Sequence, residues 1–405
     1  MEDFLKIKKA CEENTALSKS ILDRFLLSYA TEKDKLGKEA DQKLHVYKHI
    51  IEKFGRHWFD MLKSQYIIHR LMKDGGLITK YLKHAAISNL EESKRNWMAF
   101  QSENPWRFTF SEVKSQPEKD FYQMEDVFSG ENYLLYSPSI KDIVSRDGEK
   151  ELWFNLIGYN GECWQTYGPL SGYASFSPDD IFFFATELNH LIEDEVALIK
   201  DVDDNPTPYM MLFAGSTQPS VVHEGERLVM VITERKATVP NVQEMEGDFN
   251  VSYTGGVYRL GLKELELSPH FAVAYYNEKD QTMQATALTE KGYESLIDAL
   301  AKFGVKLNKN ADIYLGPSMH LTAQEILKRD IELMPLELMF EQENEEEMDE
   351  ELRKLDQLAG LAIAALTAEK EPDLEALAAE VGINLENNRQ VIEKIINDLK
   401  DKVSK

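Results

Sequence analysis

Apolar residues in the first hundred positions recur three or four residues apart, the spacing that gathers them on one face of a helix. The spacing predicts helices over residues 3–28, 32–73 and 77–86, and a fourth that follows a cap at Ser88 or Asn89 and ends near Ser102. Gly75 and Gly76 end the second helical region, and Pro105 closes the block. We therefore expect an N-terminal all-helical domain over residues 1–104.

After Pro105 the pattern changes to short runs of aromatic and β-branched residues separated by turn signals. The runs FYQMEDVFSGENYLLYS and ELWFNLIGYNGECWQTYGPLSGYASF predict a meander of short strands that could close into a small barrel. Further strands are predicted in RLVMVITERKATV, FAVAYYN and TMQATAL, the last two joined by a Glu-Lys-Asp-Gln turn. Helices are predicted from a Ser177 cap followed by Pro178, at 290–303 and at 322–334. Residues 105–335 are thus expected to form a mixed α+β domain with antiparallel strands.

An acidic run, FEQENEEEMDEE at residues 340–351, holds eight carboxylates in twelve positions. The apolar residues that follow it keep helical spacing, so we interpret 340–370 as one mostly helical segment whose first turns are solvated. A partner-binding tail is the alternative. PDLEALAAEVG and ENNRQVIEKIINDLKDK predict two more helices. Residues 336–405 are therefore expected to form an acidic connector and a small helical module, which completes an α+β fold class for the chain.

Charge is distributed unevenly over the 405 residues, whose net charge is −25. Residues 1–110 hold 20 Lys and Arg against 15 Asp and Glu, whereas the rest hold 26 against 56. An acidic surface repels phosphate backbones, so contact with nucleic acid is expected only at the N-terminal end. Apolar runs are too short to cross a membrane, and the N-terminus is charged. We expect a cytoplasmic protein with no membrane contact, in which Cys11 and Cys163 are free buried thiols, although these two could also pair.

One candidate metal site lies in HVYKH, where His45 and His49 are four residues apart and Glu52 is one turn further along the same helix face. Imidazole and carboxylate ligands at this spacing can hold zinc or another transition metal. A further ligand would have to come from elsewhere in the fold. Ordinary surface or core histidines are the alternative interpretation.

A candidate polyanion-binding surface is formed by basic residues beside aromatic ones in KFGRHWF, YIIHR, KYLKH and KRNWMAF. Cations can neutralise phosphates while exposed rings stack on unpaired bases. The competing interpretation places the rings in the core and the cations on the outer helix faces, and the spacing favours it. The residues concerned are Arg56, Arg70, Lys80, Lys83 and Arg95.

Other motifs are incomplete. Glu187 and His190 form a single Glu-x-x-His, where a di-iron bundle needs two, and HEGE at 223–226 lacks the second histidine of a metalloprotease. The sequence contains no phosphate loop, no Gly-x-Gly-x-x-Gly and no Gly-x-Ser-x-Gly. We therefore predict no catalytic residues and no cofactor.

From MEDVFSGENYLLYS onward the chain resembles a group of uncharacterised bacterial proteins. In these an aromatic helix precedes a strand, an Asp-x-x-(Thr/Ser)-Gly-Glu turn and another strand. The resemblance covers about residues 90–305, through ELWFNLIGYNGECWQTYG, GERLVMVITERKATV, YRLGLKELELSPHFAVAYYN and EKGYESLIDALAKFG. Several members end in a Cys/His zinc motif of the SEC-C type, which this chain lacks because its last cysteine is Cys163. The resemblance implies a shared α+β body and no catalytic role.

Three functional hypotheses follow. The first is a non-enzymatic adaptor or regulatory protein that acts through contacts with a protein partner. The second is a nucleic-acid-associated factor that binds through the basic N-terminal helices, and the third is a metal-dependent hydrolase whose site is assembled only by the fold. The sequence leaves the oligomeric state and the identity of the partner open.

Overall fold

The structure is a computed structural model whose contacts divide the chain into unit 1, residues 1–252 with 258–331, and unit 2, residues 253–257 with 332–405. It describes residues 3–22, 26–53, 56–140, 151–173, 176–216, 222–223, 225–239, 241–334, 336–337, 339–340, 354, 358, 361–362 and 374–382. The described residues have a mixed α+β fold, as the sequence predicts.

The N-terminal region of unit 1 is helical, as predicted, but its helices are shorter than the apolar spacing suggests. They are α1 (Phe4–Ile21), α2 (Leu27–Glu32), α3 (Leu36–His45), α4 (Lys48–Ile51), α5 (Arg56–Met72), α6 (Ile78–Leu82), α7 (Ala85–Ser88) and α8 (Glu92–Glu103). Lys35 has a left-handed backbone conformation, so the helical geometry is interrupted there and α3 begins after it. Tyr47 also departs from helical backbone angles, so α4 begins as a separate helix. The predicted cap at Ser88 or Asn89 is wrong, because α7 includes Ser88 and α8 is preceded by Glu91.

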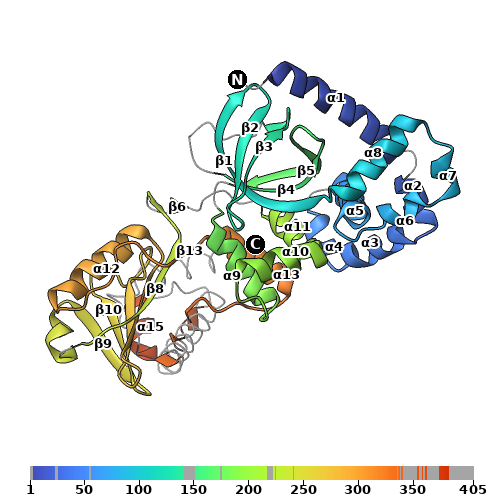
Figure 1. Ribbon diagram of the computed structural model, residues 1–405. Helices are drawn as coiled ribbons and strands as arrows, with labels where there is room; N and C mark the ends of the chain where they lie inside the picture. The colour runs from blue at the N-terminus through green and yellow to red at the C-terminus, as the bar shows by residue number, and fades with distance from the viewer. Residues whose placement is uncertain are drawn as a thin grey trace. The chain divides into compact units, whose positions relative to one another are not determined.

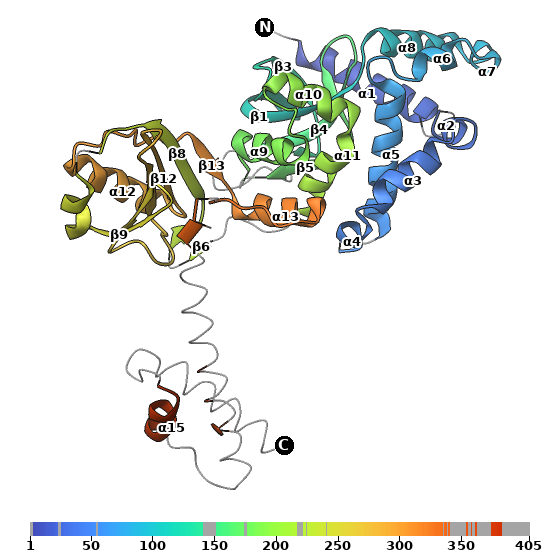
Figure 2. The same ribbon diagram turned by 90° about the horizontal axis from the view of Figure 1, so that it is seen from below.

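A closed five-stranded barrel follows, which confirms the predicted barrel. Its strands are β1 (Arg107–Glu118), β2 (Phe121–Asp126), β3 (Asn132–Tyr136), β4 (Leu152–Tyr159) and β5 (Trp164–Tyr173). The strand order is β1-β2-β3-β5-β4, and β3 pairs parallel with β5 while the other pairs are antiparallel. This is the order of a Greek-key barrel of the OB type. Strand β1 was not predicted individually, and α1 lies beside the barrel in both views (Figures 1 and 2).

Three helices follow the barrel: α9 (Pro178–Leu188), α10 (Glu195–Asp204) and α11 (Pro206–Gly215). The predicted start of α9 is confirmed, with a capping box between Ser177 and Asp180 and with Pro178 in the first turn. The helix predicted over 322–334 has different bounds. It is α13 (Pro317–Leu327), which begins at a proline and ends where Lys328 takes a left-handed conformation.

A six-stranded sheet has the order β13-β8-β12-β11-β10-β9. Its strands are β8 (Met230–Lys236), β9 (Phe249–Thr254), β10 (Val257–Leu262), β11 (Val273–Asn277), β12 (Thr282–Ala287) and β13 (Ile313–Leu315). Helix α12 (Glu290–Lys302) packs its apolar face on this sheet through Tyr293, Leu296 and Leu300 (Figure 2). The predicted turn between β11 and β12 is confirmed.

Two smaller features complete the description. Strands β6 (Val222–His223) and β7 (Glu226–Arg227) form a small antiparallel ribbon in which His223 pairs with Glu226, and a 3-10 helix, η3, covers Val242–Gly247. In unit 2, α15 (Leu374–Val381) lies within the predicted PDLEALAAEVG helix. The acidic run beyond Phe340 and the predicted last helix lie outside the described residues.

None of the helices in the described ranges is both long and apolar enough to cross a bilayer.

Candidate binding pocket at the end of the barrel

Three strand ends of the barrel meet at one rim and enclose a cavity, which we call the barrel-end pocket. Arg107 starts β1, Tyr159 ends β4 and Trp164 starts β5, and Tyr159 pairs directly with Trp164. The pocket has a volume of about 350 Å³, within the range of small-ligand sites. Its lining consists of Asp74, Glu103, Asn104, Pro105, Trp106, Arg107, Phe108, Tyr159, Trp164, Ile199, Val202 and Asp203.

Aromatic rings form the walls and are fixed by contacts behind them. The Trp106 indole stacks on Tyr167, with centroids 3.8 Å apart, and donates its Nε1–H to Gln101. Its approach to β4 requires a glycine at 158, since a Cβ there would lie 2.6 Å from the indole. Trp164 contacts Tyr159 at 5.4 Å between centroids. The walls are therefore preorganised to receive a flat or apolar group.

Carboxylates line the pocket together with these rings. Asp74 and Glu103 are exposed at the ends of α5 and α8, and neither forms an ion pair within the described ranges. Arg107 is the basic residue of the lining, and Glu131 neutralises it through an ion pair. Its guanidinium lies 4.9 Å from the centroid of the Trp164 ring, so the pocket already holds one stacked guanidinium.

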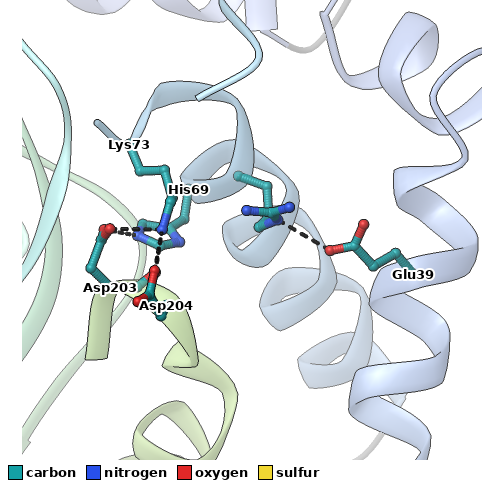
Figure 3. Close-up of polar contacts among 6 residues, drawn as sticks. Glu39, His69, Lys73, Asp203 and Asp204 are labelled. Carbon is teal, nitrogen blue, oxygen red and sulfur yellow. Dashed lines mark hydrogen bonds and ion pairs between the residues drawn. The ribbon is translucent and has the colours of Figure 1, made fainter. Parts of the chain in front are cut away.

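The third carboxylate, Asp203, is held by residues of α5 (Figure 3). Its Oδ1 lies 2.9 Å from His69 Nε2, and its Oδ2 accepts from Lys73 Nζ at 2.7 Å. Lys73 also reaches Asp204 at 3.3 Å. On the other side of α5, Arg70 donates to Glu39 at 3.1 Å. The contacts of Asp203 and Asp204 with His69 and Lys73 fix α10, and with it one wall of the pocket, against the C-terminal end of α5, whereas the Arg70–Glu39 contact joins α5 to α3.

The protonation states of this cluster follow from its environment. Burial raises the pKa of Asp203, but the hydrogen bonds from His69 and Lys73 outweigh it, so the pKa is lower than usual and the carboxylate is charged. Burial lowers the pKa of His69 more than Asp203 raises it, so the imidazole is neutral. Its Nε2 therefore carries the proton donated to Asp203. The buried Nδ1 has no hydrogen-bond partner among the residues that the structure describes.

The predicted metal ligands do not come together. His45 ends α3 while His49 belongs to α4, so the two are not four residues apart on one helix. A ring nitrogen of His49 lies 3.2 Å from the carbonyl oxygen of Glu325, and Glu52 pairs with Lys48. In the part of the chain that the structure describes, no three His, Cys, Asp or Glu side chains are grouped to hold a metal.

The predicted polyanion-binding residues are spread over α5, which carries Arg56 and Arg70, α6 with its C-cap, which carries Lys80 and Lys83, and α8, which carries Arg95, and three of the five make contacts within the chain. Arg70 pairs with Glu39, and Lys80 pairs with Asp34. Arg95 donates to backbone carbonyl oxygens at the end of α7 and just beyond it. Lys83 follows α6, and Arg56 begins α5. The described contacts therefore do not assemble these five residues into one basic surface.

The sequence did not identify the residues of the barrel-end pocket. Asp203 and His69 are 134 positions apart, and neither forms part of a recognisable motif. One signal was present in the Asp-x-x-Ser-Gly-Glu turn: Asp126 Oδ1 accepts from the backbone N–H groups of Phe128 and Ser129, and Glu131 holds Arg107. That turn thus positions a residue of the pocket.

Comparison with known proteins finds no matching family model, no similar curated protein and no similar solved structure. The resemblance to uncharacterised bacterial proteins therefore stays a prediction.

Proposed function

We propose that the chain is a non-enzymatic adaptor of the cytoplasm whose barrel-end pocket binds an arginine side chain of a partner protein. The observation that carries the proposal is the pairing of fixed aromatic walls with three carboxylates in one cavity of about 350 Å³. Aromatic faces attract cations, and a carboxylate can accept two parallel hydrogen bonds from a guanidinium.

Arginine fits this lining better than lysine does. Its guanidinium is planar and weakly hydrated, so it can stack on a ring while it donates to a carboxylate. Arg107 already stacks on Trp164 and pairs with Glu131, which is the same combination of contacts. The chain's net charge of −25 would also attract a basic segment over a longer range.

The nucleic-acid alternative has less support, because Arg70, Lys80 and Arg95 are engaged within the chain. Carboxylates in the pocket also oppose a phosphate ligand. The hydrolase alternative has no assembled ligand set among the described residues.

The proposal can be tested by calorimetric titration of the full chain with the capped peptide Gly-Arg-Gly and with its citrulline analogue. Citrulline keeps the shape and removes the charge. We expect the arginine peptide to bind with a dissociation constant of about 0.1–1 mM, equivalent to ~4–5.5 kcal/mol, and the analogue to bind at least about tenfold more weakly.

A matched pair of variants locates the binding. Ile199→Trp adds bulk to a lining residue that is 39% exposed, and it should abolish binding. Leu321→Trp makes a comparable change at an exposed position on α13, outside the lining, and should leave binding intact. Equal binding of both peptides, or unchanged binding by Ile199→Trp, would refute the proposal.

A further inference from the structure

The two cysteines of the chain meet in the core although they are 152 positions apart in the sequence. Cys11 lies on α1, and Cys163 lies at the turn that precedes β5. Their sulfur atoms are 3.3 Å apart, and both thiols are free. Ile7, Phe121 and Tyr136 pack around the two thiols. The sequence favoured free buried thiols, which the structure confirms, and the fold adds their direct contact.

The surroundings of the thiol pair distinguish its two members. The hydrogen bond from the Cys163 thiol lowers the pKa of Cys11, against the effect of burial, which raises it. The Asn160 amide nitrogen, 3.3 Å from the Cys11 sulfur, lowers this pKa further. The same hydrogen bond between the two thiols, together with burial, raises the pKa of Cys163. Cys11 is therefore the thiol of the pair that ionises more readily, and a thiolate is the reactive form of cysteine.

We propose that Cys11 and Cys163 are a two-electron redox site that hydrogen peroxide converts into a disulfide between α1 and the β4–β5 hairpin. This inference goes beyond the proposed binding function and does not depend on it. It rests on the contact of two sulfurs that have no other thiol in the sequence with which to pair.

The chemistry needs only peroxide as oxidant. The Cys11 thiolate attacks one peroxide oxygen, so the O–O bond breaks, an S–O bond forms and hydroxide leaves. The Cys163 sulfur then attacks the sulfenic sulfur of Cys11, so the S–S bond forms and the S–O bond breaks. The departing hydroxyl takes the Cys163 proton as water. Two thiols are oxidised by two electrons in total, and the peroxide becomes two waters once the first hydroxide is protonated.

Burial sets the rate and the consequence of this reaction. Cys11 is 0% and Cys163 is 2% exposed, so peroxide reaches them only when α1 or the hairpin turn opens locally. Residues 161 and 162 of that turn are exposed, which makes it a route of access. The hairpin also carries Tyr159 and Trp164, so the disulfide would fasten a wall of the barrel-end pocket to α1.

Mass spectrometry of the reduced full chain, treated with hydrogen peroxide and then digested without reductant, tests the proposal. We expect the intact mass to fall by about 2 Da, both free thiols to disappear, and one cross-linked peptide to join Cys11 and Cys163. A thiol reductant should reverse all three changes. Two intact thiols after treatment, or separate sulfinic acids on the two cysteines, would overturn the proposal.

Single variants provide the control. Cys163→Ser and Cys163→Ala should each leave a sulfenic acid on Cys11 that a dimedone probe traps, with no cross-link. The midpoint of thermal unfolding should rise on oxidation of the wild-type chain and stay unchanged in a variant that folds. A midpoint that rises equally in such a variant would show that the disulfide is not the cause and would count against the proposal.

Discussion

The carboxylate of Asp203 links the packing of α10 to the chemistry of the barrel-end pocket. It lines the cavity, and it also accepts hydrogen bonds from His69 and Lys73. The Lys73 side chain is only 10% exposed, so its ammonium depends on these partners. A buried cation without a counter-ion is costly, which makes this residue important for stability as well as for binding.

Replacing Asp203 by asparagine should lower the free energy of unfolding by about 1–3 kcal/mol, because Lys73 loses a charged partner. It should also weaken arginine-peptide binding at least about tenfold, equivalent to ~1.4 kcal/mol. Asp204→Asn is the control, since that side chain is 63% exposed and lies farther from Lys73. It should change stability by about 0.5 kcal/mol or less. Urea denaturation measures the stability of both variants. Equal losses of stability in Asp203→Asn and Asp204→Asn would contradict this account of the cluster.

The neutral state of His69 predicts a pH dependence. Burial lowers its pKa in the folded chain below the ordinary value of 6.5. The unfolded chain therefore binds more protons than the folded chain once the pH falls below that value. The stability that His69 contributes should decrease as the pH falls from 7 towards 5, whereas Asp180, whose pKa burial raises to about 6, contributes in the opposite direction over this range. Urea denaturation of wild type and variants across the range separates the two contributions. His69→Gln should reduce the decrease, whereas the exposed His45→Gln should not. If the free energy of unfolding depends on pH in the same way in wild type and in His69→Gln, His69 is not the origin of the dependence.

At the scale of elements, the pocket depends on how closely β4 approaches the start of β1. The Trp106 indole occupies the space in which a side chain at position 158 would lie, so glycine is required there by contact rather than by backbone conformation. The indole is in turn held between Tyr167 and Gln101 and cannot shift freely. Strand β4 and the wall of the pocket are therefore coupled.

Gly158→Ala should destabilise the chain by about 1–3 kcal/mol, because its Cβ would displace the Trp106 ring. Gly247→Ala is the matched control, since a Cβ at that position has no neighbour within 4 Å. It should leave stability nearly unchanged. Chemical denaturation followed by far-UV circular dichroism would compare the two variants. A Gly158→Ala chain as stable as the control would contradict the described packing.

Local signals predicted the elements better than they predicted the pocket. Ser177, Pro178 and Asp180 specify the start of α9 by contacts within four positions of the chain, so the sequence was sufficient. The breaks at Lys35, before α3, and at Tyr47, before α4, were missed, because these are not residues that usually end helices. The pocket draws on β1, β4, β5 and α10, which come together only through the closure of the barrel and the contacts of α10 with His69 and Lys73. Contacts such as Cys11–Cys163 carry no signal in the intervening sequence.

At the scale of the whole molecule, the acidic charge and the pocket support the same kind of partner. The chain has a net charge of −25, and the pocket adds Asp74, Glu103 and Asp203 as local anchors for a cation. Long-range attraction would raise the rate of encounter with a basic segment, and the pocket would determine which side chain is held. The central claim is therefore the location of arginine binding.

Nuclear magnetic resonance of the chain with ¹⁵N-labelled tryptophan tests this claim most directly. Five indole N–H signals are expected, and Trp106→Phe and Trp164→Phe assign the two that belong to the pocket. On titration with the capped Gly-Arg-Gly peptide, the Trp164 and Trp106 signals should shift in proportion to occupancy. The signals of Trp58, Trp97 and Trp153, which do not line the pocket, should stay in place. An unshifted Trp164 signal at saturating peptide would contradict the account.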